Sequence, residues 1–326
     1  MLVRTDSKKY VHTLLKKGGV SMSSKADITV PRKFDISQFI KDYGWCYAFI
    51  AIPIVLFLMF TLFPVGYAFI MSFQKYHVLG STWVGLDNYK TMLQDDIFWK
   101  SMKNTFIFTV GTVPVNVAIT LFLAVLIFPR AQKAQTFFKA SLYLPTVASG
   151  VTIALVWFWI YDPTTAGLFN MFLGLLGIDN VMWLGQSSTA LLSIMLMSYL
   201  TGHGAGIILY LAAMGGIPKS LYEAADIDHA SSWSKFKNIT WPLLKPTTLY
   251  LLVTGIIMSF QVFMSIYLMT QGGPNFATTT IAYLIYVHAF EYYQFGLAAA
   301  ESFALGAIII VASVIQFKVM SSDVEF

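Results

Sequence analysis

Residues 223–242 read EAADIDHASSWSKFKNITWP, a polar stretch inside an otherwise apolar chain. It holds three acidic residues, two lysines and a histidine, and long uncharged runs flank it on both sides. Pro218 fits the first position of a helix, where its missing N–H costs nothing. A serine at 231 or 232 can cap a second short helix over 233–239, and Pro242 and Pro246 are expected to close the unit. The pattern predicts two short helices joined by a turn.

This stretch carries more apolar side chains than a solvated loop needs. The excess favours a helical knob that docks into a partner protein. A loop lying flat on a membrane surface is the alternative, and local pattern alone leaves both open. The apolar residues concerned are Tyr222, Ala225, Trp233, Phe236, Ile239 and Trp241.

Composition identifies the solvent of the rest of the chain. Of 326 residues, 57% are hydrophobic and only 11% are charged, whereas a soluble domain carries about a quarter charged residues. Such a chain cannot cover itself with solvated side chains, so lipid is the expected surrounding. Cys46 is the single cysteine, which excludes an intramolecular disulfide and predicts a buried free thiol.

The chain is therefore expected to be an all-α integral membrane protein. Six apolar stretches are long enough to cross a bilayer core, which takes roughly 20 residues. Pro53 and Pro64 fall in the first stretch, where they are expected to bend a helix without ending it. The expected spans are 45–72, 104–128, 141–161, 189–213, 247–270 and 297–317.

Basic residues set the expected orientation, because Lys and Arg gather on the cytoplasmic side. Seventeen of the 21 lie in the two termini and in the second and fourth connections, against four in the first connection. Both termini and the 223–242 loop are thus expected to be cytoplasmic. The predicted parts are a tail over 1–43, a membrane domain over 44–320 with its loop at 214–245, and a short tail over 321–326. Basic residues that follow a membrane face argue against nucleic-acid binding.

The connections expected to face outward have their own character. Residues 74–103 include the acidic and aromatic stretches VGLDNY and DDIFWK and should be structured, and residues 162–188 hold no Lys or Arg. After a Gly/Pro turn at 271–280 comes an aromatic segment, for which an interfacial belt is favoured over contact with a sugar. Its members are Tyr283, Tyr286, Phe290, Tyr292, Tyr293 and Phe295.

The 223–242 stretch resembles the EAA loop of permease subunits in bacterial ATP-driven (ABC) importers. Glu223, Ala224, Ala225, Asp228, Ala230, Phe236, Ile239 and Pro242 stand at matching positions. The flanking motifs are similar to the carbohydrate branch of that family: VGLDNY at 84–89, NT at 104–105, LP at 144–145, LAAMGGIP at 211–218 and GGP at 272–274. Two positions depart from the pattern: His229 replaces a glycine and Trp241 a leucine. Histidine tolerates a left-handed turn at a penalty, so the turn should survive.

The resemblance implies a function and its partners. The loop would insert into an ATPase subunit, with ATPase-coupling residues Glu223, Ala224, Ala225, Asp228, His229, Ala230 and Phe236. Implied partners are a second homologous permease, two ATPase subunits, an extracytoplasmic solute-binding protein and membrane lipid, in the bacterial plasma (inner) membrane. The chain lacks a G-x-x-x-x-G-K-[ST] phosphate loop, so ATP and Mg²⁺ are expected on the ATPase partners. It is expected to hold no cofactor or metal and to be no enzyme itself.

A substrate pathway is implied about six helical turns before Glu223, in the YLTGHGA stretch at 199–205. The small residues there suit either close helix packing or a sugar ring. His203, the only imidazole expected deep in the membrane, is either functional or hydrogen-bonded to a neighbouring helix. The implied pathway residues are Ser198, Tyr199, Thr201, Gly202, His203, Ala205, Gly255, Met258 and Ser259.

A secondary solute carrier and an intramembrane hydrolase are the rival classes, and the carrier would explain the hydrophobicity equally well. A secondary solute carrier needs intramembrane acids or broken helices for its coupling ion. Here Glu301 is the only acid inside an expected span, near its outward end, where it should reach water or headgroups. An intramembrane hydrolase is weaker still, because the sequence has no HExxH or GxSxG motif. The sequence leaves the sugar open between neutral and acidic (uronate) oligomers.

Overall fold

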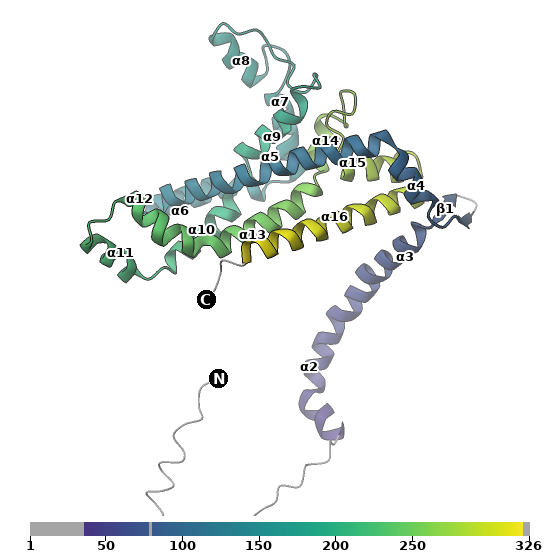
Figure 1. The fold of residues 1–326 in the computed structure, drawn as a ribbon, viewed down its shortest axis with the longest axis horizontal. Helices are drawn as coiled ribbons and strands as arrows, with labels where there is room; N and C mark the ends of the chain where they lie inside the picture. Colours follow the sequence, from purple (N-terminus) through teal and green to yellow (C-terminus); the bar gives the residue numbers. More distant parts are fainter. Residues whose placement is uncertain (1–35, 78–79, 322–326) are drawn as a thin grey trace, which may run out of the picture. The chain divides into compact units, whose positions relative to one another are not determined.

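The computed structural model describes residues 36–77 and 80–321, and Figure 1 shows that they are almost entirely helical. Residues 1–35 of the predicted N-terminal tail and residues 322–326 of the predicted C-terminal tail lie outside the described residues. The first elements are α2 (Ile36–Phe57), the π-helix η1 (Leu58–Leu62), α3 (Phe63–Met71), β1 (Gln74–His77), β2 (Gly80–Trp83) and α4 (Asp87–Gln94). Then come α5 (Asp96–Ile127), α6 (Gln132–Val147), α7 (Gly150–Ile160), α8 (Leu168–Leu175), α9 (Ala190–Leu200) and α10 (Gly204–Gly215). The remaining elements are α11 (Lys219–Ile227), α12 (Ser232–Lys235), η2 (Phe236–Thr240), α13 (Trp241–Phe260), α14 (Met264–Met269), α15 (Ile281–Tyr286), η3 (Val287–Glu291) and α16 (Phe295–Ser321).

The chain divides into one unit that ends at Leu62 and a second that begins at Phe63. In the first unit, α2 and η1 expose apolar side chains on every side from Trp45 onward. Pro53 stands inside α2 without ending it. Cys46 is exposed, as are its neighbours along α2 from Trp45 onward, so the prediction of a buried thiol was wrong.

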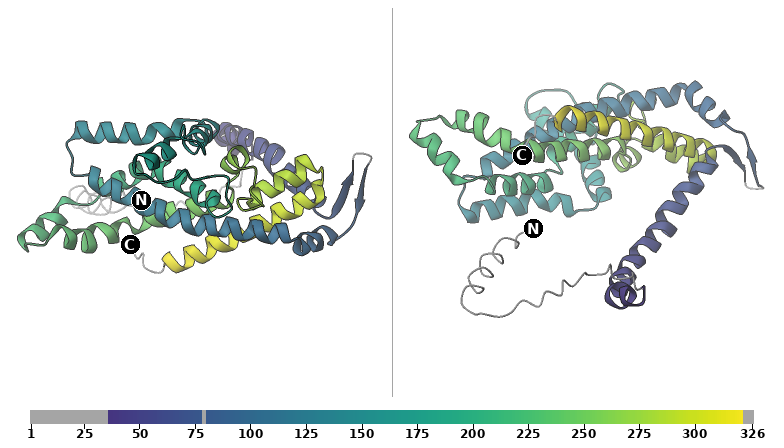
Figure 2. Two further views of the ribbon diagram at one scale, coloured as in Figure 1. Left: turned by 90° about the horizontal axis from the view of Figure 1, so that it is seen from above. Right: turned by 60° about the horizontal axis from the view of Figure 1, so that its bottom comes forward.

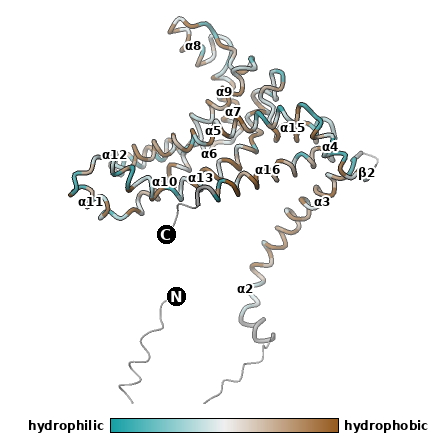
Figure 3. The backbone as a smooth tube through the Cα atoms, in the orientation of Figure 1, coloured by the Kyte–Doolittle hydropathy of each residue, from teal (hydrophilic) through white to brown (hydrophobic). Residues whose placement is uncertain are grey.

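In the second unit, α5 is the central helix. It packs against α9, α10 and α13, while α16 packs along α13, and the views in Figure 2 show these long helices side by side. One core cluster joins Ala124 of α5, Tyr210 of α10 and Leu244 of α13, all with no exposed surface. Figure 3 shows how strongly hydrophobic residues dominate this bundle.

Four helices in the described residues are long and apolar enough to cross a membrane: 43–71, 96–127, 232–260 and 295–318. Two bent pairs raise that number to six if each pair is one span. The expected span over 141–161 is broken between α6 and α7 by 96°, and that over 189–213 between α9 and α10 by 43°. The span expected over 247–270 is interrupted after Phe260, before α14. The apolar stretches of the sequence predicted where the spans lie but not where they break.

The second long helix begins earlier than hydrophobicity indicated. Asp95 caps α5, with its carboxylate accepting a hydrogen bond from the Ile97 N–H at 2.9 Å. Charged residues such as Lys100 and Lys103 then occupy its first turns, so an apolar window starts only at Asn104. A good N-cap extends a helix beyond its apolar part.

The segments expected to face outward are structured where described, as predicted for 74–103. β1 and β2 form an antiparallel hairpin, and α4 follows it. Asn104 of α5 donates hydrogen bonds to the carbonyl oxygens of Phe276 and Thr279 at 2.9 and 3.0 Å, which fastens the Gly/Pro turn. In the aromatic segment Phe290, Tyr292 and Tyr293 are exposed, but Tyr283 is buried. Tyr283 thus belongs to the core and not to an interfacial belt.

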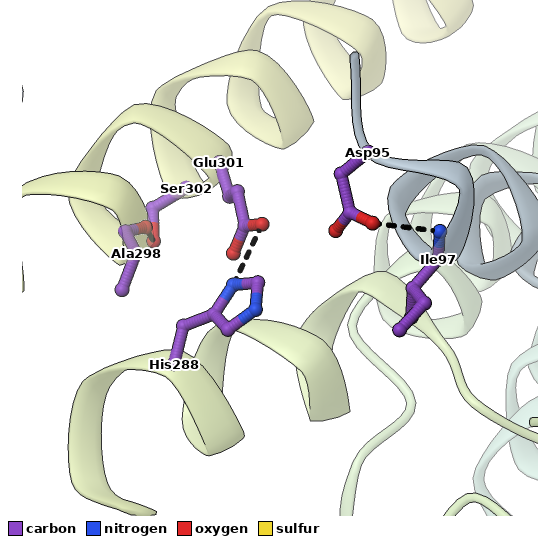
Figure 4. A network of polar contacts seen from close by, with 6 residues as sticks. All are labelled: Asp95, Ile97, His288, Ala298, Glu301 and Ser302. Atoms are coloured by element: carbon purple, nitrogen blue, oxygen red, sulfur yellow. Dashed lines mark hydrogen bonds and ion pairs between the residues drawn. The ribbon is translucent and has the colours of Figure 1, made fainter. Parts of the chain in front are cut away.

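Glu301 of α16 does not reach water. Its side chain has no exposed surface, and its Oε1 lies 2.9 Å from Nδ1 of His288 in η3 (Figure 4). The other carboxyl oxygen, Oε2, has no hydrogen-bond partner among the described residues. The expectation that Glu301 meets water or headgroups was wrong, because η3 turns back over α16 and covers it.

This pair predicts asymmetric stability effects. His288→Ala leaves the Glu301 carboxyl buried without a partner, so we expect it to lower the free energy of unfolding by about 3–5 kcal/mol. Glu301→Gln keeps an acceptor for the imidazole and should cost clearly less, and the double variant His288→Ala/Glu301→Leu should recover part of the loss. Thermal unfolding of the purified protein in lipid nanodiscs measures all three. Equal losses for His288→Ala and Glu301→Gln would contradict a stabilising pair.

Candidate functional site

The 223–242 stretch folds as two short helices at one end of the bundle, α11 and α12, as its pattern predicts (Figure 1). Pro218 is the N-cap of α11, one position before its expected place as first helical residue. Figure 3 shows hydrophilic residues gathered at α11. This end of the molecule is therefore a polar cap on an apolar bundle.

His229 adopts the left-handed conformation that its position requires. Its φ is 51°, and the turn around it has the hydrogen bonds of a Schellman motif. The Ala230 N–H donates to the Ala225 carbonyl at 2.9 Å, and the His229 N–H donates to the Asp226 carbonyl at 3.1 Å. The prediction of a left-handed turn here is confirmed, with an imidazole-bearing residue in the place that glycine occupies most easily.

Three further interactions hold the second helix against the first. The Ser231 hydroxyl accepts from the Ser234 N–H at 3.2 Å and caps α12. Lys235 forms an ion pair with Asp226. The Tyr222 hydroxyl lies 2.8 Å from that of Thr240 in η2. The two helices are thereby fixed as one rigid unit.

The prolines after this unit do not close it, contrary to expectation. A single helical run extends from Ser232 to Phe260. Pro242 lacks an N–H, and its ring would collide with the Asn238 carbonyl of a regular α-helix. The π-helix η2 widens the turn at that place. The second short helix is therefore continuous with the long helix α13.

The predicted coupling residues are grouped on this unit. Glu223, Ala224, Asp228 and His229 are exposed, while Ala225, Ala230 and Phe236 are half-buried. Large apolar side chains beside them are also exposed, with Ile227 at 79% and Trp233 at 70%. Exposed apolar groups next to charged ones are typical of a docking surface.

A cavity of about 520 Å³ lies among α5, the α9–α10 break and α13. Eight of the nine predicted pathway residues line it: Ser198, Thr201, Gly202, His203, Ala205, Gly255, Met258 and Ser259. Tyr199 is the exception, since its hydroxyl donates to the Gly111 carbonyl of α5 at 3.0 Å. Residues from two distant parts of the sequence thus meet at one place.

The break between α9 and α10 shapes this cavity. Gly202 has a φ of 84°, and no atom lies within 4 Å of where its Cβ would be. Two residues later, a Cβ on Gly204 would come 2.5 Å from the Tyr143 Cα of α6. Gly204 therefore allows close packing of α10 against α6, and Gly202 borders open space.

Side chains satisfy two of the carbonyl groups at the end of α9, where the break interrupts the helix. Thr201 Oγ1 donates to the Met197 carbonyl at 2.7 Å, and His203 Nε2 donates to the Tyr199 carbonyl at 2.8 Å. His203 Nδ1 lies 2.8 Å from the Thr120 hydroxyl of α5. The alternative of a hydrogen bond between His203 and a neighbouring helix is confirmed.

The sequence analysis missed the contribution of α5. Thr112, Asn116 and Thr120 line the cavity from this helix, and α13 adds Tyr250 and Thr254. The residues of α5 recur at a spacing of four, which puts them on one helix face. That polar stripe in an apolar span was the signal that could have found them.

Comparison with known proteins places these features in a family. Residues 116–320 match the model of the binding-protein-dependent transport system inner membrane component. The chain is 33% identical to the probable ABC transporter permease protein YesP of Bacillus subtilis, over 88% of this chain and 93% of that protein. It is 34% identical to the arabinooligosaccharides transport system permease protein AraP of Bacillus subtilis, over 85% of this chain and 88% of AraP.

Solved structures share the fold as well. A crystal structure of a bacterial ABC transporter involved in the import of the acidic polysaccharide alginate contains a chain with a TM-score of 0.80 and 25% identity. The match covers 89% of this chain and 99% of that one. A second structure of a bacterial alginate ABC transporter, in complex with an alginate pentasaccharide-bound periplasmic protein, gives a TM-score of 0.76 at 26% identity.

The two glycines at the break predict different substitution costs. Gly202→Ala meets open space and should cost only left-handed strain, about 1 kcal/mol. Gly204→Ala drives a methyl group into the α6 backbone, so we expect a loss of about 1–3 kcal/mol, as for other overpacked sites. Thermal unfolding in nanodiscs compares them. A Gly204→Ala protein as stable as Gly202→Ala would contradict the close contact of α6 and α10.

Proposed function

The chain belongs to the family of inner membrane components of binding-protein-dependent transport systems, and on that premise we propose that it translocates a saccharide through the cavity beside α5. It is a multi-pass protein of the bacterial inner membrane and an ABC importer permease, which sets aside the secondary carrier. The observation that supports the pathway is that Gly202 and its neighbours line one cavity with α13.

A saccharide substrate is supported by relatives across the family. AraP is a permease for arabinooligosaccharides, and other relatives include a lactose permease protein of Rhizobium radiobacter. The cavity fits this class in size, because its volume lies within the roughly 300–1,000 Å³ usual for small-molecule sites. Its hydroxyl and amide side chains suit the hydroxyl groups of a sugar.

The partners follow from the family and from the exposed surface at α11. We propose that this chain pairs with a second permease, receives its substrate from an extracytoplasmic binding protein and docks two ATPase subunits. ATP and Mg²⁺ would be held by the ATPases, and this chain would perform no chemistry of its own. Its topology would be six spans within 44–320, with both termini and the loop at 214–245 cytoplasmic, as the bias of basic residues supports.

Coupling would run through α10. This helix starts at Gly204 beside the cavity and ends at Gly215 just before α11, a length of about 18 Å at 1.5 Å per residue. The other helix of the unit continues into α13, which lines the same cavity. A movement of the loop therefore reaches the cavity along two rigid helices, which is what an ATP-driven lever requires.

Glu223 provides the first test of this lever. It is exposed on α11 and forms no ion pair with any residue that the structure describes. If it contacts a basic group of the ATPase, Glu223→Ala should reduce saccharide uptake at least about tenfold, the effect of losing about 1.4 kcal/mol. Uptake into proteoliposomes and retention of the ATPase subunits on the purified complex are measured together.

The two readouts separate two roles. Lost uptake with the ATPases retained indicates uncoupling, and lost uptake with the ATPases released indicates docking. Lys219→Ala at the start of the same helix is the matched control for loss of an exposed charge. Unchanged uptake in Glu223→Ala would contradict the proposed role of the loop in coupling.

His229 provides the second test. Glycine fits a left-handed turn without strain, so His229→Gly should transport near normally. A β-branched residue is a genuine outlier there, so His229→Val should weaken ATPase binding and uptake. Both variants are measured in the complete transporter by uptake and by co-purification. Val tolerated as well as Gly would refute the backbone requirement, and weaker binding in His229→Gly alone would show that the imidazole contacts the ATPase.

A further inference from the structure

A groove of about 610 Å³ lies on the surface of the bundle between α5 and α16, both of which pack against α13. The residues of each wall recur at a spacing of three or four, which puts them on one helix face. The α16 wall extends from Ala307 to Ile315, a length of about 12 Å at 1.5 Å per residue. The α5 wall consists of Trp99, Met102, Lys103 and Phe106.

The groove is apolar except at one point. Among the described residues that line it, Lys103 is the single charged one. The only other side-chain nitrogen or oxygen of these residues is Nε1 of Trp99, which already donates to the Leu93 carbonyl at 2.9 Å. Phe260 forms the floor, where it is buried in one cluster with Phe98. The groove therefore offers an apolar surface and one cation.

Lys103 marks the place where α5 enters the apolar part of the membrane. Lys100 precedes it by one turn, whereas no charged residue follows it until Arg130. Trp99 lies beside it, and tryptophan is enriched at the level of the lipid headgroups. α16 begins at the same end of the bundle, next to β1 and α4, and Ala307 lies twelve residues or about 18 Å further along. The groove thus extends from the headgroup level into the hydrocarbon region.

The ammonium group of Lys103 has no ion pair or hydrogen bond with any residue that the structure describes. Two other lysines of the same connection are engaged, since Lys90 pairs with Asp87 and Lys100 donates to the Asn275 carbonyl at 2.6 Å. Under the proposed topology this connection faces outward, where lysines are few. An unpaired cation at the edge of the hydrocarbon region is unfavourable unless an anion meets it.

A phospholipid supplies both groups that this groove can bind. Its acyl chain can lie along the apolar walls, and its phosphate can meet the ammonium group of Lys103. An anionic headgroup suits the site better than phosphatidylcholine, because the choline cation offsets the charge of the phosphate. We propose that the groove binds an anionic phospholipid, with the phosphate at Lys103 and one acyl chain between α5 and α16.

A helix of the second permease would also cover the apolar walls. It would have to bring an acidic side chain to Lys103, because a lysine that is buried without a partner is strongly unfavourable. The lipids of the bilayer surround the chain in any case, and an anionic lipid carries the matching charge itself. The site therefore depends on the membrane and not on the solute that is transported.

Lipid binding to the purified complete transporter tests this site. Phosphatidylglycerol and phosphatidylcholine with identical acyl chains are added to the delipidated complex in detergent, and native mass spectrometry counts the bound molecules at each concentration. We expect Lys103→Gln to weaken binding of one phosphatidylglycerol molecule per copy of this chain about fivefold, the effect of losing about 1 kcal/mol. Phosphatidylcholine binding should not change. Lys90→Gln, in the same connection but outside the groove, is the matched control and should bind both lipids as wild type.

The apolar walls are tested by filling the groove. Ala307→Phe places a ring between the walls without changing any charge, so we expect it to displace the same phosphatidylglycerol molecule. Ile310→Phe is the control, because Ile310 is 65% exposed on the same helix and does not line the groove. Co-purification of the second permease and of the ATPase subunits shows whether each variant folds and assembles.

Three results would overturn the proposal. Wild-type binding of phosphatidylglycerol by Lys103→Gln would show that this lysine holds no lipid phosphate. Equal weakening of both lipids in Lys103→Gln would show that the groove does not select an anionic headgroup. Loss of the second permease from Ala307→Phe, with phosphatidylglycerol binding unchanged in Lys103→Gln, would show that the groove is a protein interface.

Discussion

The structure depends on one constraint: a backbone group in lipid must find its partner within the protein. The α9–α10 break interrupts the helix beside the cavity. Side chains of the break replace two of the backbone hydrogen bonds that are lost there. Thr201 and His203 bond the carbonyls of Met197 and Tyr199, and Gly202 takes a φ of 84°. The same residues that keep the break stable therefore form the polar wall of the cavity.

The break also divides a span into parts with different tasks. α9 is held to α5 through Ser198 and Asn116, and the start of α10 is held to α5 through His203 and Thr120. α10 begins with Gly204 tightly against α6 and leads straight to the α11 unit. The cavity and the exposed loop thus lie at opposite ends of one rigid element.

Sequence reasoning succeeded where a pattern is local. The turn at His229 was predictable because the family that the loop resembles has glycine at this position, and glycine adopts a left-handed conformation most easily. The residues that the resemblance implied for a pathway, apart from Tyr199, line one cavity. It failed where the deciding contact is distant. Hydropathy treats Thr189–Ala213 as one span, since Gly202 is as apolar as its neighbours. Burial of Glu301 depends on His288 folding back across a turn, and the hydrogen bond of Asn116 to Ser198 joins residues 82 positions apart in the sequence.

The proline positions show how the bundle and the loop remain mechanically connected. Had Pro242 ended the second short helix, a flexible joint would separate the loop from α13. The π-helix η2 absorbs the proline and keeps the run from Ser232 to Phe260 continuous. Since α13 lines the cavity with Gly255 and Ser259, both helices of the unit lead to the same place. Under the proposed coupling, a displacement of the loop would reach the cavity through α13, which runs unbroken from Trp241 to Phe260.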